Sequence, residues 1–342
     1  MQNANIAPQQ LTPQRIMQLC WGFAPPLIIG AAIRHKLFDS LAAAPLTAEQ
    51  LAQVTHTDPR ALRMIANAHT SFGLLFKDAQ NRYALTPESD AFLVSHKPSF
   101  QGGIFKHLDT QLIPNWMHLS EILQTGRPAT AANEASKGAE FFEQFVEDIF
   151  PMSYPAATAL GKALNLAQSK APVRVLDLAT GSGVWGIALA QQSPNVSVTA
   201  VDWPSVLNVT RRVVKRFELA DRFTYVEGDL HAVDFGKNHT LATLGHILHS
   251  EGPERSKELI QKTFAALAPG GQIAIAEFLS NDNRTGPANA AIFAVNMLVN
   301  TDHGDTFTVP EISAWLKQVG FANVKTLEAP GPSPLILATK PA

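Results

Sequence analysis

The second half of the chain follows a regular order of apolar strands and amphipathic helices. Val173, Val175 and Leu176 are β-branched or apolar, which predicts a strand buried on both of its faces that ends at Asp177. Similar apolar runs follow, with helical segments of ten or more residues between most of them. Strands are expected at 196–201, 223–227, 241–248, 272–279, 324–327 and 335–339. This alternation predicts an α/β domain with a doubly wound, mostly parallel, Rossmann-like sheet.

The first hundred residues show a helical period followed by two short extended segments. Residues 26–41 share an apolar helical face, and Thr47 and Asp58 are expected to cap the next two helices. Short strands at 73–77 and 82–86 then follow, as in the wing of a winged helix. Together these elements predict a winged-helix domain.

A winged helix can bind DNA or join two subunits. Residues 1–100 hold eight Lys and Arg against six Asp and Glu, and the whole chain of 342 residues has a formal charge of -2. A protein that reads a DNA duplex usually carries a clear basic stripe. We therefore expect a dimerisation domain at 1–100 and no nucleic-acid partner. An all-helical connector at 101–170 leads into the sheet and completes a second domain at 101–342.

One apolar stretch, 16–33, has to be weighed against a membrane span. It contains no charged residue and is nearly as long as the ~20 residues that cross a bilayer. Pro25 and Pro26 would interrupt a helix there. A buried helix pair at a subunit interface is therefore expected, and not a membrane span.

The termini and the cysteine content bound the cellular setting. The first ten residues have no charged segment before an apolar core, so no secretory signal is visible and a cytoplasmic location is expected. The single Cys20 excludes an internal disulfide and a cysteine-built metal site, and no metal is expected.

A glycine-rich turn follows the first strand of the sheet. Gly181, Gly183 and Gly186 have the spacing of the dinucleotide-binding fingerprint, and Asp202 follows about 20 residues later, where it can accept hydrogen bonds from ribose hydroxyls. NAD and S-adenosylmethionine (SAM) both satisfy this pattern. Asp177, directly before the turn, would repel a pyrophosphate but could bind the amino group of a methionyl moiety.

Further polar residues come at the ends of other strands. Asp229, in Gly228-Asp-Leu230, suits the exocyclic amine of adenine, and Glu277 ends an apolar strand that follows Pro269-Gly-Gly271. Since ligands bind beyond the carboxyl ends of parallel strands, these acids and His249 are expected at one edge of the sheet. The acids favour SAM over NAD.

Five motifs in the second half occur together in one family. They are Asp177-Leu-Ala-Thr-Gly-Ser-Gly183, Val201-Asp-Trp-Pro-Ser-Val-Leu207, Gly228-Asp-Leu230, His246-Ile-Leu-His249 and Leu267-Ala-Pro-Gly-Gly-Gln-Ile-Ala-Ile-Ala-Glu277. Jointly they resemble the dimeric small-molecule O-methyltransferases, of the caffeate, hydroxyindole and hydroxyneurosporene types. This family includes plant enzymes and bacterial enzymes of pigment and antibiotic pathways. The resemblance covers almost the whole chain.

The resemblance implies a homodimer that uses SAM and methylates the hydroxyl of a small, hydrophobic, aromatic acceptor. His249 matches the general base and Glu277 the acid that orients it, while His246 is expected to be structural. The implied cofactor-binding residues are Asp177, Gly181, Gly183, Asp202, Trp203, Gly228, Asp229 and Leu230. The implied acceptor-binding residues are Met152, Phe293, Asn296, Met297, Trp116 and Phe142.

The chain departs from the family pattern at several positions. Ala179-Thr180 replaces two glycines, Ser250-Glu251 replaces Asp-Trp after the base, and Gly245 stands where plant members often have Lys. Thr306, beside Asp305, takes the place of the second acid. Methylation of N, S or C on the same scaffold, a NAD-dependent oxidoreductase, a nucleotide-sensing DNA-binding regulator and an inactive member of the family therefore remain alternatives.

Overall fold

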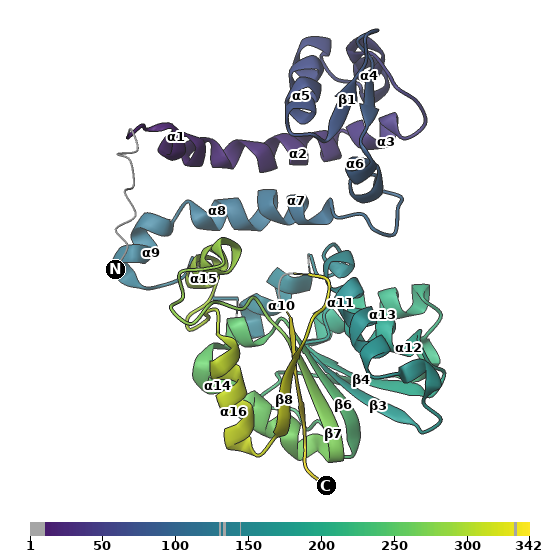
Figure 1. Cartoon of the computed structure of the whole chain (residues 1–342), viewed down its shortest axis with the longest axis vertical. Helices are drawn as coiled ribbons and strands as arrows, with labels where there is room; N and C mark the ends of the chain where they lie inside the picture. The colour runs from purple at the N-terminus through teal and green to yellow at the C-terminus, as the bar shows by residue number, and fades with distance from the viewer. Residues whose placement is uncertain (1–10, 130, 133–134, 144, 332–333) are drawn as a thin grey trace, which may run out of the picture. The chain divides into compact units, whose positions relative to one another are not determined.

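The structure, a computed structural model, describes residues 11–129, 131–132, 135–143, 145–331 and 334–342. The chain divides into two units, Met1–Asp109 and Thr110–Ala342 (Figure 1). The sequence places this boundary between residues 100 and 101. In the structure it falls within a single π-helical turn, Leu108–Leu112.

The first unit is a helical domain with a two-stranded wing. Its elements are α1 (Gln14–Cys20), a 3-10 turn (Trp21–Phe23), α2 (Ala24–Arg34), α3 (Leu37–Leu41), α4 (Ala48–Thr55), α5 (Pro59–Ser71), β1 (Leu75–Lys77), β2 (Tyr83–Leu85), α6 (Pro87–Phe92) and α7 (Gly103–His107). β1 and β2 pair antiparallel. The Thr47 hydroxyl accepts from the Gln50 N–H and caps α4, and Asp58 caps α5, both as predicted. The winged helix is confirmed.

Two details of the N-terminal helices differ from the prediction. The single helix expected at 26–41 is divided, because Lys36 adopts a left-handed φ of 56° between α2 and α3. Pro25 and Pro26 do not end the helical path. They occupy the first positions of α2, where the missing N–H groups cost little, and the 3-10 turn connects α2 to α1.

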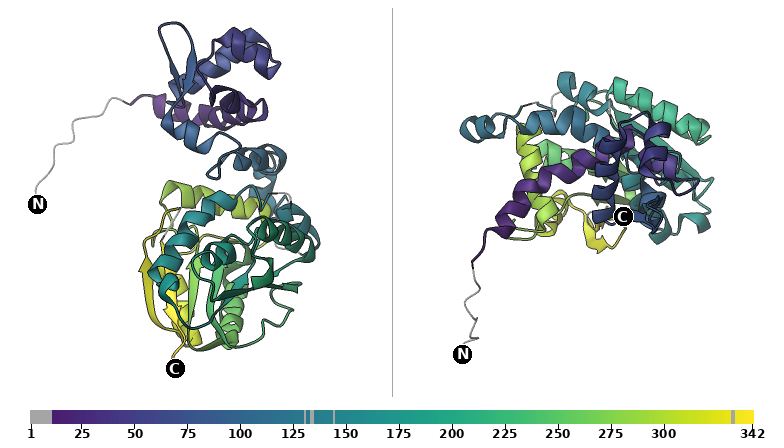
Figure 2. Two further views of the ribbon diagram at one scale, coloured as in Figure 1. Left: turned by 90° about the vertical axis from the view of Figure 1, so that its right-hand side faces the viewer. Right: turned by 90° about the horizontal axis from the view of Figure 1, so that it is seen from above.

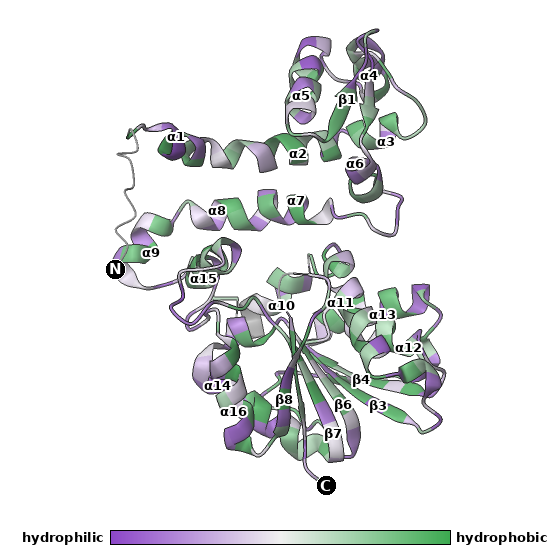
Figure 3. Cartoon of the chain, viewed as in Figure 1, coloured by the Kyte–Doolittle hydropathy of each residue, from purple (hydrophilic) through white to green (hydrophobic). Residues whose placement is uncertain are grey.

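The helical stretch Gln14–Arg34 is long and apolar enough to cross a membrane by length and composition alone. The sequence predicts that this stretch is buried at a subunit interface, and within a single chain most of it is exposed. Ile16, Leu19, Trp21 and Phe23 are each more than half exposed, and green, hydrophobic segments recur along α1 and α2 in Figure 3. This apolar surface has no cover from the described part of the chain.

The second unit contains the predicted sheet, with strand order β5-β4-β3-β6-β7-β9-β8. The strands are β3 (Val173–Leu178), β4 (Val196–Asp202), β5 (Phe223–Glu227), β6 (His239–Gly245), β7 (Leu267–Ala276), β8 (Ala322–Leu327) and β9 (Leu335–Thr339). β3 to β7 run parallel, while β9 pairs antiparallel with both β7 and β8. The glycine turn leaves the central strand β3.

Helices cover both faces of this sheet, as two views show (Figure 2). They are α11 (Phe150–Ala163), α12 (Val184–Ala190) and α13 (Pro204–Arg216) on one face, and α14 (Leu248–Ala266) and α16 (Val309–Val319) on the other. Each face of the sheet packs against its helices in a separate hydrophobic core. Neighbouring residues of β3 alternate between these cores: Val175 packs with α11, α12 and α13, and Leu176 packs with α14 and α16. This alternation explains why apolar residues occur on both faces of the strand.

Further helices and 3-10 turns complete the second unit, several of them in the connector. They are α8 (Ile113–Trp116), α9 (Leu119–Thr125), α10 (Ala135–Glu143), 3-10 turns at Leu166–Gln168 and Ala220–Arg222, and α15 (Ala288–Asn300). Between 101 and 170, the described elements other than turns are helices.

Two strand ends lie earlier than the sequence predicts. β6 stops at Gly245 and not at Leu248, because His246 turns out of the strand with a positive φ of 62°. His249 consequently lies in the first turn of α14, which is kinked at Gly252. β7 includes Pro269-Gly-Gly271 and ends at Ala276, so that Glu277 follows it directly.

Candidate functional site

A pocket lies beyond the carboxyl ends of β3, β4, β5 and β6, in the second unit. The empty space inside it, including the open solvent at its mouth, is about 950 Å³. Phe142, Val146 and Ile149, from α10 and the segment after it, line it as well. Of the predicted cofactor residues, it is lined by Gly181, Asp202, Trp203, Gly228, Asp229 and Leu230.

The glycine turn satisfies its own backbone N–H groups. The Gly181 N–H donates to Asp202 at 2.9 Å, the Gly183 N–H to the Thr180 carbonyl at 2.7 Å, and the Gly186 N–H to Asp177 at 3.1 Å. A phosphate-binding turn instead points such groups at its ligand. The three glycines therefore match the dinucleotide spacing without offering their amides to a pyrophosphate.

Asp177 holds this turn together from inside the protein. It is fully buried, and its carboxylate accepts hydrogen bonds from the hydroxyls of Thr180 and Thr243, both at 2.7 Å, and from the Gly186 N–H. Burial raises the pKa of Asp177 to about 6, although these three donors act against it. Asp177 does not line the pocket, whereas the sequence predicts it there as the residue that binds the amino group of a methionyl moiety.

Asp202 and Asp229 both line the pocket. Burial raises the pKa of Asp202 to about 6, against the hydrogen bonds from the N–H groups of Gly181 and Trp203. Asp229 accepts from the His231 N–H at 2.8 Å, which fixes its carboxylate beside Leu230.

The charges around the pocket favour a cationic ligand. Asp202, Asp229 and Glu251 line it, whereas no Lys or Arg does so among the described residues. A pyrophosphate would place negative charge beside these carboxylates, while a sulfonium would be attracted to them. The residues present therefore fit SAM and not NAD.

Two further residues lie elsewhere than the sequence suggests. Phe142, expected beside the acceptor, lines the cofactor pocket, with its ring centre 6.1 Å from that of Trp203. Gly183 does not line the pocket. It precedes α12 with a φ of 81°, and a Cβ there would lie 3.1 Å from Thr210.

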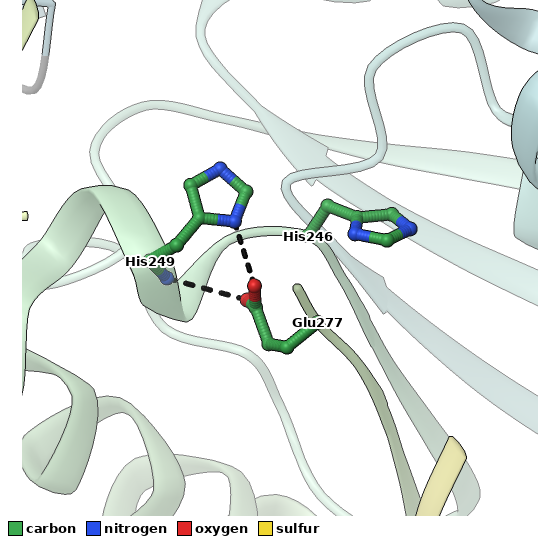
Figure 4. A group of neighbouring side chains, drawn as sticks. All are labelled: His246, His249 and Glu277. Carbon is green, nitrogen blue, oxygen red and sulfur yellow. Dashed lines mark hydrogen bonds and ion pairs between the residues drawn. The ribbon is translucent and has the colours of Figure 1, made fainter. Parts of the chain in front are cut away.

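His249 and Glu277 form a buried pair next to this pocket (Figure 4). The Nδ1 atom of His249 lies 2.6 Å from Oε2 of Glu277, and the Leu248 N–H donates to Oε1 at 2.7 Å. Burial pushes the pKa of Glu277 upward, but the charge and hydrogen bonds of His249 outweigh it and hold the pKa below its usual value. Because the carboxylate accepts from Nδ1–H, the free lone pair of the neutral ring is on Nε2.

His246 lies at the junction of the pocket and this pair. It lines the pocket, its ring centre is 6.4 Å from that of His249, and its Nδ1 has no hydrogen-bond partner among the described residues. Burial lowers its pKa to about 4, so that the ring is neutral at pH 7. The sequence interpretation of His246 as structural did not anticipate that it would line the pocket.

Donor atoms of His246, His249 and Glu277 lie within 4.8 Å of one another, a grouping that can bind a metal ion. The separation of 2.6 Å between His249 and Glu277 is that of a charge-assisted hydrogen bond. Two ligands of a tetrahedral metal stand about 3.3 Å apart. The geometry fits a proton-transferring pair better than a metal centre.

Aromatic rings surround His249 on the side predicted for the acceptor. Phe293 meets its ring edge-on at 4.9 Å, and Phe278 stacks on Phe293 at 3.9 Å. The sequence interpretation missed Phe278, although its position directly after Glu277 is a signal that could have identified it.

The other predicted acceptor residues divide into two groups. Asn296 accepts hydrogen bonds through Oδ1 from the Trp116 indole at 2.9 Å and from Asn300 at 3.0 Å. Asn296 comes three residues after Phe293 on α15, so Trp116 of α8 contacts the face of α15 that carries Phe293. Met297 is buried, whereas Met152 is 39% exposed on α11 and lines no described pocket.

The positions expected to supply a second acid do not contact His249 through their side chains. The Thr306 hydroxyl pairs with Ser280 at 2.8 Å, and Asp305 forms an ion pair with Arg284 at 2.9 Å. Within the described residues, Glu277 is the carboxylate that holds His249.

Comparison with known families and relatives agrees with this geometry. A family model of the O-methyltransferase domain matches residues 116–322, and one of the O-methyltransferase dimerisation domain matches residues 17–95. The tetracenomycin polyketide synthesis 8-O-methyl transferase TcmO of Streptomyces glaucescens is 28% identical over 333 residues, which cover 96% of this chain and 97% of TcmO. Acetylserotonin O-methyltransferase of Bos taurus is 27% identical, over 93% of this chain and 95% of its own.

Solved structures share the fold along nearly the whole length. A protein from Nostoc punctiforme superposes with a TM-score of 0.87 at 26% identity, covering 97% of this chain and all of its own. Human N-acetylserotonin methyltransferase, solved in complex with SAM, has a TM-score of 0.85 at 21% identity, covering 98% of this chain and 99% of its own. With both family models matched and a pocket that fits SAM, the chain belongs to the SAM-dependent O-methyltransferases that carry their own dimerisation domain.

Proposed function

We propose that this enzyme methylates a hydroxyl group of a small aromatic acceptor, with His249 as general base and Glu277 as the residue that orients it. When bound, SAM supplies an electrophilic methyl group. The observation that carries the proposal is the buried pair itself: Nδ1 of His249 is held at 2.6 Å by Glu277, beside an acid-lined pocket.

The base needs Glu277 because a phenol is a weak acid. An ordinary imidazole titrates about 3.5 units below a phenol, so complete proton transfer before attack would cost roughly 4.8 kcal/mol. A carboxylate on Nδ1–H stabilises the imidazolium that forms and lowers this cost. Proton removal is therefore expected to accompany attack by the acceptor oxygen.

The surroundings of His249 support a flat, apolar acceptor. Phe278 and Phe293 offer aromatic surface next to the base, and aromatic rings prefer such stacked or edge-on neighbours. The relatives agree with this assignment, since one carries the name 3-hydroxy-5-methyl-1-naphthoate 3-O-methyltransferase and is 27% identical over 97% of this chain. Asn296 and Trp116 would border the far side of the acceptor.

We further propose a homodimer formed through the first unit and a cytoplasmic location. The match to a dimerisation domain at 17–95 supports the dimer, as does the exposed apolar surface of α1 and α2. The cytoplasmic location stays a prediction.

The base assignment is tested by replacing His249. Incubating a panel of phenols with isotopically labelled SAM and detecting products by mass first identifies an acceptor. His249→Ala should then lower turnover at least ~10²-fold while leaving the affinity for S-adenosylhomocysteine unchanged. Glu277→Gln, which keeps a hydrogen-bond acceptor but removes the charge, should give an intermediate loss.

A matched control is available on the surface. His118 lies 3.9 Å from Glu121, and both side chains are more than half exposed. His118→Ala should therefore retain normal turnover. Near-normal activity of His249→Ala on the same acceptor would show that His249 is not the base, and methylation of amine or thiol analogues in place of the hydroxyl would reassign the acceptor atom.

A further inference from the structure

Glu251 is a buried acid of the cofactor pocket that the roles assigned so far do not use. It comes two residues after His249, in the first turns of α14, and is 7% exposed. It lines the pocket together with Asp229 and Leu230. A carboxylate in this position is costly to bury unless its oxygens have partners.

Only one of its two oxygens is satisfied by the described part of the chain. Oε2 accepts from Nε of Arg255 at 2.5 Å and from Nε2 of His231 at 2.9 Å. Oε1 accepts no hydrogen bond from any described residue. The side chain is therefore held rigidly through one oxygen, and the other is available to a ligand.

The same contacts join Glu251 to the loop after β5. His231, which bonds Glu251 through its ring, also donates its backbone N–H to Asp229 at 2.8 Å. Lys262 of α14 donates to the Leu230 carbonyl at 2.7 Å. These bonds bring Asp229, Leu230 and Glu251 to one end of the pocket, where two carboxylates stand beside an apolar side chain.

This combination suits one part of the cofactor. A purine ring can lie against Leu230, and the exocyclic amine of adenine has two N–H groups but no strong acceptor. A 6-oxo purine would direct an oxygen towards the same two carboxylates. We propose that Glu251 acts with Asp229 to select the 6-amino group of the cofactor's adenine, an inference that rests on the proposed use of SAM in this pocket.

The proposal is tested by comparing two ligands that differ at this group. S-adenosylhomocysteine and S-inosylhomocysteine share every part except the 6-amino or 6-oxo substituent. By calorimetry the native enzyme should bind the adenosyl compound at least ~10²-fold more tightly. Glu251→Gln should lose roughly tenfold or more for the adenosyl compound and lose nothing for the inosyl compound, because an amide can donate to the 6-oxygen.

Glu258 provides a matched control. Its carboxylate lies 3.5 Å from His231, but its side chain is 68% exposed and does not line the pocket. Glu258→Gln should leave both affinities unchanged. If Glu251→Gln does not fold, Glu251→Asp withdraws the charge by one methylene and should likewise reduce the preference for the adenosyl compound.

The possible results distinguish a failure of the role proposed for Glu251 from a failure of the proposed function. If the native enzyme binds neither ligand, its proposed function fails. If it binds the adenosyl compound tightly and the variants lose affinity for both ligands equally, Glu251 only supports the loop. Its proposed role in selecting the adenine 6-amino group is then overturned. An unchanged ratio of affinities in a folded variant leads to the same conclusion.

Discussion

At the scale of single residues, Asp177 and Asp202 illustrate two uses of neighbouring carboxylates. Both have a pKa raised to about 6 from an ordinary 3.8, chiefly because they are buried. Asp177 faces inward and holds the glycine turn, whereas Asp202 faces the pocket. The pH dependence of the unfolding free energy measures such pKa shifts.

The sign of the effect follows from the direction of the shift. A carboxyl with a raised pKa in the folded state contributes stability that is fully present below pH ~4 and is lost as the pH rises through ~6. Asp202→Asn removes one of these two groups. The unfolding free energies of the variant and of the native enzyme are compared without ligand. Their difference should shift in favour of the variant by roughly 1–3 kcal/mol as the pH rises from 4.5 to 7.5.

Urea unfolding at several pH values measures this difference directly. The absolute stability of the variant can be lower, because Asn cannot accept from both the Gly181 and the Trp203 N–H groups as a carboxylate does. A stability difference that does not change with pH would contradict the raised pKa of Asp202.

At the scale of elements, the approach of α12 to the sheet depends on Gly186. A Cβ at this position would lie 2.8 Å from Val198 and 3.0 Å from Phe223. Glycine to alanine within a helix normally stabilises a protein by roughly 0.5–1 kcal/mol. Here the steric conflict should reverse the sign, and we expect Gly186→Ala to destabilise the fold by about 1–3 kcal/mol in urea unfolding.

Gly161 of α11 is the control for this change. A Cβ there would meet the amide end of Gln192, which can move aside by giving up its hydrogen bonds to the Thr158 and Ala188 carbonyls. Gly161→Ala should therefore cost less than Gly186→Ala. Equal effects of the two substitutions would mean that close packing of α12 is not the reason for a glycine at 186.

At the scale of the whole molecule, the N-terminal helices present an apolar stripe. Ile16, Leu19, Phe23 and Leu27 are 69%, 73%, 59% and 40% exposed, and their spacing of three or four residues places them on one helix face. Exposed stripes of this kind mark interfaces. The match to a dimerisation domain identifies a second copy of the chain as the expected partner.

A double substitution, Leu19→Glu with Phe23→Glu, should convert the dimer to a monomer. The reason is that two carboxylates would be buried in an apolar interface without partners. Light scattering after gel filtration measures the mass. Val54→Glu, at a single 56% exposed position on α4, is the control and should remain a dimer. A native enzyme that is monomeric, or that floats with lipid vesicles, would contradict the assignment.

The sequence predicts most of the architecture but less of the side-chain geometry. Hydrophobic periodicity and capping residues such as Thr47 are local signals, so the winged helix and the order of strands are predictable. The end of β6 is not, because it depends on a left-handed His246. Asp177 and Phe142 could be placed near the site, but which way each faces is decided by packing with Thr243 and Trp203, distant in sequence.

The glycine turn, with its N–H groups already bonded to Asp177, Thr180 and Asp202, has a consequence for turnover. An empty pocket leaves none of these three amides without a partner, so the loop has no need of a ligand to keep its shape. Release of the product cofactor therefore leaves these three N–H groups hydrogen-bonded, and the next SAM molecule binds to a loop that already has its final conformation. Cofactor exchange between cycles should therefore proceed without reordering of this segment.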